Sequence, residues 1–210
     1  MRNERVVVGI SGASGAALGV RIVERLSALP HVEIHLVVSD AARRTLDLEC
    51  GPDAMESLLP LVHCHHPNGD IGASIASGSF PVSGMVIAPC SMQTLSAVAT
   101  GRTDTLLARA ADVQLKERRR LILLARETPL HLGHLRNMCA VTEMGAIVMP
   151  PVPAFYHLPQ SLAEVVDHLA ARAIDLLALA AGPLAKSWEG TSSLVFRSGE
   201  AKGTMPPHGE

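Results

Sequence analysis

The sequence predicts a doubly wound α/β fold, a three-layer sandwich built on a mainly parallel sheet. Short runs of β-branched and other apolar residues alternate with segments whose apolar residues recur every three or four positions, which indicates strands separated by amphipathic helices. The strand-like runs are continuously apolar, as expected for parallel strands covered on both faces. Ligands of such sheets bind beyond the carboxyl ends of the strands, so the residues that follow each strand are the first candidates for a site.

Five strands are expected, each followed by a turn or by the start of a helix. They span residues 6–8, 34–38, 85–88, 121–125 and 146–149. A helix after the first strand is indicated by apolar residues at helical spacing, namely Leu18, Ile22, Leu26 and Leu29. A long helix is expected over residues 161–180, because Ser161 and Glu164 form a capping box at its start.

Two stretches fall outside this repeat. Residues 68–84 are rich in Gly and Ser and are interpreted as a mobile loop or a clamp. Residues 186–210 show little periodicity and are interpreted as an extended tail, although they contain the only tryptophan, Trp188. We therefore expect one domain over residues 1–185 and a tail over residues 186–210 that is partly ordered around Trp188.

The composition excludes several classes of protein. The 210 residues are 48% hydrophobic but only 18% charged, against roughly 25% charge in a typical domain. Intrinsic disorder is therefore excluded, and oligomerisation is expected to bury the extra apolar surface. The formal net charge of −2 argues against a general nucleic-acid binder, since those carry a basic excess. An aromatic content of 2% argues against a stacking platform for single strands.

Cysteine spacing and hydropathy indicate the compartment. The four cysteines, Cys50, Cys64, Cys90 and Cys139, form no C-x-x-C pair and suggest no disulfide framework. No apolar run reaches the ~18 residues that a membrane span needs, and glycines at residues 9–15 interrupt the apolar start of the chain. We expect a cytoplasmic protein with no membrane association and no targeting segment.

The loops after the first three predicted strands share one chemical character. They offer Gly12, Ala13, Ser14 and Gly15 after the first strand, Ser39 after the second, and Ser91 with Thr94 after the third. Such loops at helix starts present free backbone N–H groups, the positive end of a helix dipole and hydroxyl donors. Turns and N-caps alone explain any single loop of this kind, but three at one sheet edge favour a phosphate-bearing cofactor.

Standard motifs do not name that cofactor. Gly9, Gly12 and Gly15 form G-x-x-G-x-x-G, which differs from the dinucleotide pattern G-x-G-x-x-G, and no Walker A lysine follows. Ala13 and Ala16 stand where the second glycine of a G-x-S-x-G nucleophile motif would be. The loops therefore indicate an anion site without identifying its ligand.

Basic residues in the second half of the chain supply candidate phosphate ligands. Arg109, Lys116 and residues 118–120 precede the fourth strand, and Arg126 follows it. A solvated helix face explains residues 118–120, whereas Arg126 lies at the expected ligand edge. Arg172 lies among alanine, leucine and isoleucine in the last helix, where an arginine needs an anionic partner such as a phosphate.

Possible metal ligands do not form a convincing site. Residues 63–66 read His-Cys-His-His, and successive side chains of a strand point to opposite faces, so the four cannot converge on one ion. His131 and His134 share a helical spacing but lack the H-E-x-x-H glutamate. We expect no metal site, and we interpret Cys90 as a buried core thiol instead of a nucleophile.

Six segments resemble the flavin prenyltransferase family in the same order. They are GISGASG at residues 9–15, ASGSF at 76–80, PCSMQTL at 89–95, RAADVQLKERR at 109–119, RETPLHLGHL at 126–135 and PPVPAFYHLPQS at 150–161. The resemblance extends from Val6 to Trp188. It implies a Rossmann-like sheet of the flavoprotein type, with an FMN-binding domain over residues 1–185.

The resemblance implies a metal-independent transfer of a prenyl group to reduced FMN. N5 of the flavin takes C1 of the dimethylallyl group of dimethylallyl phosphate, phosphate leaves, and flavin C6 closes a fourth ring on C3. The product, prenylated FMN, would serve a separate decarboxylase of ubiquinone or aromatic-acid metabolism. Members of the family form homododecamers, which fits the low charged fraction of this chain.

The resemblance also implies roles for individual residues. The implied FMN contacts are Gly12, Ala13, Ser14, Ser39, Ser91, Met92, Gln93, Thr94 and Arg126. The implied contacts of the prenyl phosphate are Arg109, Lys116, Tyr156 and Arg172. The implied catalytic residues are Ser14, Glu49, Lys116, Glu127 and Trp188. Lysine and arginine can neutralise the leaving phosphate without Mg²⁺, and the face of Trp188 can stabilise allyl cation character.

Some departures and alternatives stay open. Ile71 stands where some relatives carry an aromatic residue, and Gln93 stands where they carry lysine or glycine, so its FMN contact is expected through the backbone. Glu49 and Glu127 are expected to handle protons, and the alternative is that they are surface or paired carboxylates.

Two alternative functions are an FMN-dependent decarboxylase of the cysteine-decarboxylase group and a non-catalytic FMN carrier. The loop PCSMQT at residues 89–94 differs from the P-x-S-A-N-T-like loop of that group. Lys116, Glu127, Tyr156 and Arg172 are all present, which argues against a carrier without chemistry of its own.

Overall fold

The protein contains a six-stranded parallel sheet, seen in a computed structural model that describes residues 3–188. The strand order is β3-β2-β1-β4-β5-β6, and every neighbouring pair is parallel. The strands are β1 (Glu4–Ile10), β2 (Val32–Val38), β3 (Cys64–Pro67), β4 (Gly84–Cys90), β5 (Arg120–Ala125) and β6 (Ile147–Val148). The doubly wound α/β fold expected from the sequence is confirmed.

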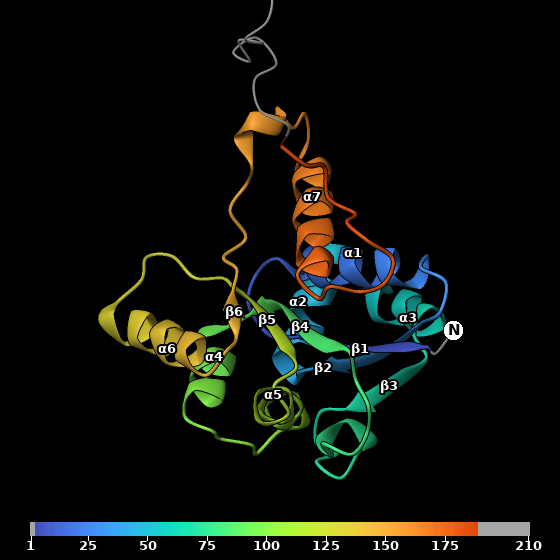
Figure 1. Cartoon of the computed structure of the whole chain (residues 1–210). Coiled ribbons are helices and arrows are strands. Elements are labelled where there is room, and N and C mark those ends of the chain that lie inside the picture. The colour runs from blue at the N-terminus through green and yellow to red at the C-terminus, as the bar shows by residue number, and fades with distance from the viewer. Residues whose placement is uncertain (1–2, 189–210) are drawn as a thin grey trace, which may run out of the picture.

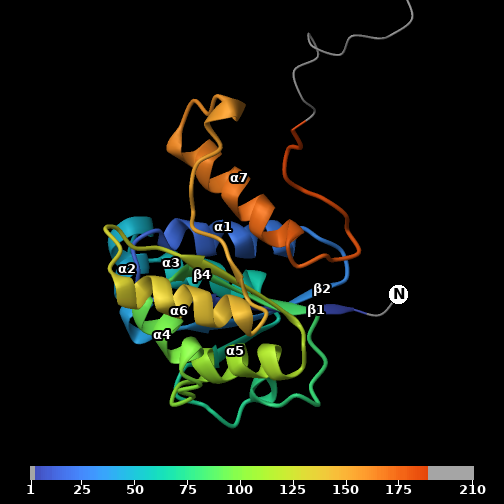
Figure 2. The ribbon, with the colours of Figure 1, turned by 60° about the vertical axis from the view of Figure 1, so that its left-hand side comes forward.

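Helices cover both faces of the sheet (Figure 1). The α-helices are α1 (Ala16–Ser27), α2 (Asp40–Cys50), α3 (Ala54–Leu58), α4 (Met92–Ala99), α5 (Leu106–Lys116), α6 (Leu132–Glu143) and α7 (Leu162–Asp175). The short 3-10 helices are η1 (Leu59–Leu61), η2 (Ser74–Ala76) and η3 (Phe155–His157). The views of Figure 1 and Figure 2 agree that α1 and α7 lie over one face and α5 over the other. Among residues 3–188, no helix combines the length and hydrophobicity that crossing a bilayer requires.

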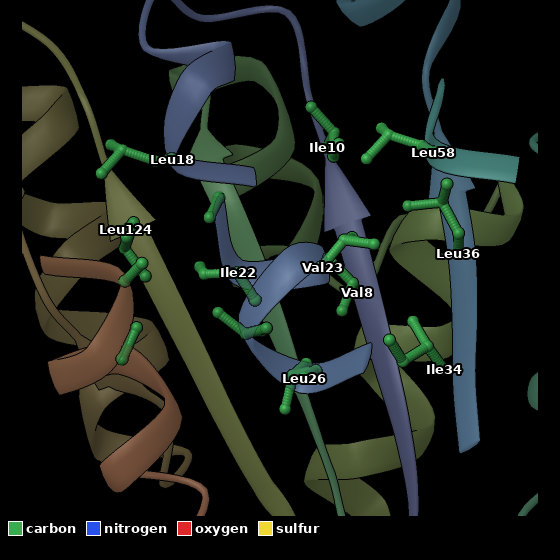
Figure 3. Close-up of a cluster of buried hydrophobic side chains, with 14 of the residues drawn as sticks. Val8, Ile10, Leu18, Ile22, Val23, Leu26, Ile34, Leu36, Leu58 and Leu124 are labelled. Atoms are coloured by element: carbon green, nitrogen blue, oxygen red, sulfur yellow. The ribbon is translucent and has the colours of Figure 1, made fainter. Parts of the chain in front are cut away.

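Two clusters of buried aliphatic side chains hold these layers together. On the α1 and α7 face, Val8 and Leu36 from the strands pack with Ile22 and Leu26 from α1 (Figure 3). On the other face, Val7 belongs to the cluster that includes residues of α4 and α5. Since successive side chains of one strand enter opposite clusters, both faces of β1 are buried, which explains its continuously apolar sequence.

The elements differ from the sequence expectation in three places. The strand β3 was not expected, because its residues Cys-His-His-Pro form no apolar run. The fifth expected strand shortens to Ile147–Val148, since Pro150 has no N–H to continue the ladder. The helix expected over 161–180 ends at Asp175, and the backbone of Ala178 is left-handed, with a φ of +54°.

Residues 150–188, which we call the arm, rise from the end of β6 to η3 and return through α7 (Figure 2). An ion-pair network fixes α7 to α1, because Arg21 Nε lies 2.6 Å and Arg25 Nη2 lies 2.5 Å from the carboxylate of Asp167. The hydrogen bonds from Arg25 and Arg21 outweigh burial and lower the pKa of Asp167 to about 2. The arm is therefore anchored to the body of the domain at its helix.

Candidate active site

The loops that follow β1 and β4 are tied together by one side chain. The hydroxyl of Ser11 donates to the carbonyl oxygen of Pro89 (2.9 Å) and accepts from the backbone N–H of Ser91 (2.7 Å). The loop after β2 joins them, because the N–H of Ser39 donates to the carbonyl oxygen of Ile10 (3.0 Å). The three loops therefore meet at the carboxyl edge of the sheet, as the sequence predicts.

A cavity of about 520 Å³ opens beside these loops, which is within the size range of small-molecule sites. Seven of the predicted site residues line it, namely Gly12, Ser39, Ser91, Met92, Gln93, Thr94 and Glu127. Ala13 and Arg126 each neighbour a lining residue in the chain, and Ser14 is two residues from Gly12, but none of the three lines the cavity itself. We call this space the sheet-edge cavity.

Ser39 and Ser91 are N-caps of helices that begin at this cavity. Ser39 Oγ accepts from the N–H of Ala42 (3.1 Å) in α2, and Ser91 Oγ accepts from the N–H of Thr94 (3.3 Å) in α4. The explanation of these serines as N-caps is therefore correct. It is compatible with a ligand site, because the N-termini of α2 and α4 place positive dipole ends beside the cavity, where a phosphate is stabilised.

Glycine shapes the loop between β1 and α1. A Cβ on Gly12 would lie 2.4 Å from the Cβ of Ala41 in α2, so a side chain there would push the loop away from that helix. Gly15 has a φ of +103°, a left-handed conformation that favours glycine. The close approach of this loop to α2 forms one wall of the sheet-edge cavity.

The carboxylate of Glu49 caps α1 from the end of α2. Its Oε2 accepts from the N–H groups of Gly15 and Ala16, both at 2.8 Å. Burial alone would raise the pKa of this carboxyl, but the hydrogen bonds from Ser14 and the two backbone N–H groups, with the charge of Arg126, hold it below its usual value. Glu49 is therefore ionised at neutral pH and orients the loop that contains Ser14.

The end of β5 brings a cation and a carboxylate to the same edge. The backbone N–H of Arg126 donates to the carbonyl oxygen of Cys90 (3.1 Å), and Glu127 lines the cavity with its Oε1 accepting from the N–H of Thr128 (2.9 Å). Cys90 is fully buried, and burial raises the pKa of its thiol to about 12. The interpretation of Cys90 as a core thiol is confirmed.

Aromatic rings meet on the arm, away from the sheet-edge cavity. The ring of Trp188 is edge-on to that of Tyr156, with centroids 5.1 Å apart. The neighbouring His157 packs on His168 of α7, with centroids 4.6 Å apart. A second cavity, of about 330 Å³, is lined in part by His157, His168 and Lys186. The fold thus brings together Tyr156 and Trp188, two residues that the resemblance links to the prenyl donor.

Arg172 follows His168 by one helical turn on α7. Its side chain is 53% exposed, and its Nη1 lies 3.8 Å from Oδ2 of Asp175. The expectation that Arg172 lies in apolar surroundings is wrong, because α7 is amphipathic and buries Ala171 and Ala173 instead. The guanidinium is presented on the surface of the arm.

Lys116 and Arg109 lie on α5, across the sheet from the arm (Figure 1). Lys116 Nζ donates to the carboxylate of Glu117 (2.5 Å), and Arg109 Nε donates to the carbonyl oxygen of Ala76 (3.2 Å). Both cations lie against the ASGSF segment. Within one chain, Lys116 and Arg109 therefore lie across the sheet from Arg172 and from the pair formed by Tyr156 and Trp188. A single chain does not bring the four predicted prenyl-phosphate contacts together.

Asn68 lines the sheet-edge cavity, although sequence reasoning did not select it. Its backbone oxygen accepts from the N–H of Leu106 (2.8 Å), and its side-chain Oδ1 accepts from the N–H of Leu107 (3.1 Å), so it caps α5. Asn68 follows β3 directly. Because β3 is polar, the sequence does not indicate a strand end there, and the Asn-Gly pair is the one local signal.

Comparison with known proteins shows the family to which the chain belongs. Residues 1–173 match the family model described as Flavoprotein, so the fold and the site define a flavoprotein. Flavin prenyltransferase UbiX of Salmonella typhimurium is 55% identical over 172 residues, which cover 82% of this chain and 90% of that protein. UbiX of Escherichia coli K12 is 54% identical over 176 residues, which cover 84% and 93%. The chain belongs to the flavin prenyltransferase family.

Several solved structures are also similar to this chain in sequence and fold. AnUbiX (PadA1), crystallised with FMN and dimethylallyl pyrophosphate, is 44% identical with a TM-score of 0.83 and covers 90% of this chain and 100% of its own. A dodecameric FMN-dependent UbiX-like decarboxylase from Escherichia coli O157:H7 is 42% identical with a TM-score of 0.84, covering 89% and 100%. The cysteine decarboxylase TvaF covers 84% of this chain and 99% of its own at 17% identity and a TM-score of 0.61, which shows a common fold alone.

The substitution Glu49→Gln tests the carboxylate cap. We expect it to lower the free energy of unfolding at neutral pH by less than about 1 kcal/mol, since an amide oxygen is the weaker acceptor and solvent screens the charge. The folded-state pKa of Glu49 is below its unfolded value, so the ionised carboxylate stabilises the fold above ~pH 4.3 and loses this contribution as the pH falls through the folded-state pKa. The measurement is urea unfolding of both proteins at neutral and at acidic pH.

The difference in stability between the two proteins should shrink on acidification. The control is Glu56→Gln, which removes an exposed carboxylate for which residues 3–188 show no side-chain hydrogen bond. A difference for Glu49→Gln that stays constant with pH would contradict the cap.

Proposed function

We propose that this chain joins the dimethylallyl group of dimethylallyl phosphate to N5 and C6 of reduced FMN and releases prenylated FMN. The observation that carries the proposal is the sheet-edge cavity, where two helix N-termini and the close-packed glycine loop favour a flavin phosphate. The bond from C1 to N5 forms as the bond from C1 to the phosphate oxygen breaks, and N5 loses its proton. The C2=C3 double bond then opens as C2 takes a proton, C3 bonds to C6, and C6 loses its proton. The complex of AnUbiX with FMN and dimethylallyl pyrophosphate supports FMN together with a dimethylallyl donor.

The FMN contacts in this proposal are those implied by the resemblance, at Gly12, Ala13, Ser14, Ser39, Ser91, Met92, Gln93, Thr94 and Arg126. The N-termini of α2 and α4 lie beside the cavity and favour the flavin phosphate. Gln93 is the second residue of α4, where its backbone N–H has no partner within the helix and is free to bind the ligand. Ser14, on the loop that Glu49 orients, is proposed to stand at the reacting edge of the flavin.

The prenyl phosphate is proposed to bind between chains. Tyr156 and Arg172 contact it from the arm, while Lys116 and Arg109 reach it from another copy, because a single chain holds them on the opposite face of the sheet. Fixed cations neutralise the charge that develops on the leaving phosphate, and they can do so without Mg²⁺. Trp188, packed against Tyr156, stabilises the positive charge on the departing allyl group.

Carboxylates at the sheet edge are proposed to handle the protons. Glu127 lines the cavity and accepts the C6 proton directly or through the released phosphate, which is itself a base. Glu49 accepts hydrogen bonds from the N–H groups of Gly15 and Ala16. In this proposal Glu49 therefore chiefly positions the loop that contains Ser14.

The proposed assembly is a homododecamer. The arm exposes large apolar side chains, among them Phe155, Leu158 and Leu162, and such a surface is stabilised when other copies cover it. A dodecameric UbiX-like structure supports this arrangement. Residues 1–185 would form the FMN-binding domain and 186–210 the tail, of which residues 189–210 lie outside the described part.

We also propose that prenylated FMN passes to a separate decarboxylase in the cytoplasm. All four cysteines of the chain are free thiols, which fits a reducing compartment.

The mass of the extracted flavin tests the activity. The protein is incubated anaerobically with reduced FMN and dimethylallyl phosphate, and in a parallel sample with the pyrophosphate. We expect the flavin to gain one five-carbon prenyl unit. In the Lys116→Ala variant the rate of prenyl transfer should fall about a hundredfold or more, because the leaving phosphate loses a fixed cation. FMN that binds but stays unchanged with both donors would indicate a carrier, or a decarboxylase of the cysteine-decarboxylase group.

The substitution Arg172→Ala separates donor binding from flavin binding. We expect kcat/KM for the prenyl donor to fall about a hundredfold or more, while the Kd for FMN changes little, because Arg172 lies on the arm and does not line the sheet-edge cavity. Arg172→Lys is the matched control, since it keeps the positive charge and should recover part of the loss. Equal losses in both constants, measured by kinetics and by FMN titration, would overturn the assignment of Arg172.

A further inference from the structure

Two histidines and a cysteine lie side by side on one face of the sheet, at its β3 edge. Cys64 of β3 is in register with His35 of β2, and His66 is two residues further along β3, so all three side chains share a face. His35 Nδ1 lies 2.9 Å from His66 Nε2, and Cys64 Sγ lies 3.9 Å from His66 Nδ1. One ligand atom from each residue can be chosen so that all three atoms lie within 4.8 Å of one another.

The sequence argument against a metal ion at residues 63–66 is therefore incomplete. It is correct for His65, whose side chain lies near Arg43 of α2 on the opposite face. It fails for Cys64 and His66, because residues two apart share a face and His35 arrives from the neighbouring strand. The register of β2 against β3, which the sequence does not reveal, completes the cluster.

The cluster is enclosed, and one of its polar atoms has no partner. His35 and His66 are 4% and 7% exposed, respectively, and the edge of His35 packs on the ring of Phe80 with centroids 5.3 Å apart. Within residues 3–188, the buried Nε2 of His35 has no hydrogen-bond partner. Burying two imidazoles costs free energy unless their nitrogens are satisfied, so this environment favours a ligand for the cluster.

All three side chains of the cluster are of types that ligate metal ions. Imidazole binds in its neutral form and cysteine as the thiolate.

We propose that His35, Cys64 and His66 bind one zinc ion. Two imidazoles and one thiolate suit this borderline-soft cation, and its bonds of about 2.0–2.3 Å set ligand atoms roughly 3.3–3.7 Å apart in a tetrahedron. The ligand atoms, one from each residue, lie within 4.8 Å of one another, so the side chains must close by up to about an ångström to reach that spacing. Solvent or His63, whose ring centroid is 5.7 Å from that of His35, fills the fourth position.

The zinc ion acts as a structural clamp. It joins the edge strand β3 to β2 beneath Phe80, at the end of the glycine-rich segment that contains the ASGSF motif. None of the three ligands lines the sheet-edge cavity or the second cavity, so this inference does not rest on the proposed transferase activity.

Cobalt and zinc titrations of the tag-free full chain, stripped of metal by a chelator, test the site. One equivalent of Co²⁺ should produce the visible bands of a four-coordinate ion together with a thiolate-to-cobalt charge-transfer band, and Zn²⁺ should bleach both. Zinc should also raise the midpoint of thermal unfolding in a concentration-dependent way. Cys64→Ser should remove the charge-transfer band and weaken zinc binding by more than about a hundredfold, since even outer-shell changes cost 10–100-fold.

Matched variants distinguish this site from adventitious binding. His65→Gln changes the adjacent histidine on the other face, and Cys139→Ser removes an exposed thiol elsewhere, so both should keep the spectrum and the affinity. His66→Asn should lose affinity as Cys64→Ser does. The proposal is overturned if wild type shows no charge-transfer band at saturating cobalt, if the band survives in Cys64→Ser, or if His65→Gln and Cys139→Ser lose it equally.

Discussion

The pairing of β1 with both β2 and β4 is the constraint on which the rest of the structure depends. The chain extends the sheet in one direction through β2 and β3 and in the other direction through β4, β5 and β6. Because the direction reverses beside β1, the loops after β1 and β4 diverge to opposite faces and leave a crevice at the carboxyl edge. The hydroxyl of Ser11 closes this arrangement by bonding to Pro89 near the end of β4 and to Ser91 just after it.

The same groups that end the strands also build the site. Ser39 and Ser91 start α2 and α4, and in doing so they aim two helix dipoles at one cavity. Gly12 permits the close contact with Ala41, and Glu49 satisfies the first N–H groups of α1 while it orients the loop containing Ser14. The hydrogen bonds that start these helices therefore also shape the cavity, which is why explaining the serines as N-caps does not argue against a ligand.

How far the sequence predicts the structure depends on the kind of signal each element carries. The continuously apolar strands identify β1, β2, β4 and β5, and the topology then determines that Gly12, Ser39 and Ser91 share an edge. The polar strand β3 carries no such signal, so Asn68 at its end and the cluster of His35, Cys64 and His66 are found only through strand register. The surroundings of Arg172 are misjudged because local composition does not show which face of α7 is buried.

A single chain does not explain how all the predicted cations could contact one phosphate, but an assembly of chains does. Lys116 and Arg109 lie on one face of the sheet, while Tyr156, Arg172 and Trp188 lie on the arm over the other face. The exposed apolar side chains of the arm supply the surface through which a second copy can bring Lys116 to Arg172. The proposed prenyl-phosphate site is therefore completed between chains.

The most direct test is complementation between two inactive variants. Lys116→Ala and Arg172→Ala chains are co-expressed with different affinity tags, and mixed oligomers are isolated through both tags. The account predicts that mixed oligomers recover prenyl transfer to FMN although each variant alone has lost it, because some sites receive both an intact Lys116 and an intact Arg172. Mixed oligomers as inactive as the parent variants would contradict a site shared between chains.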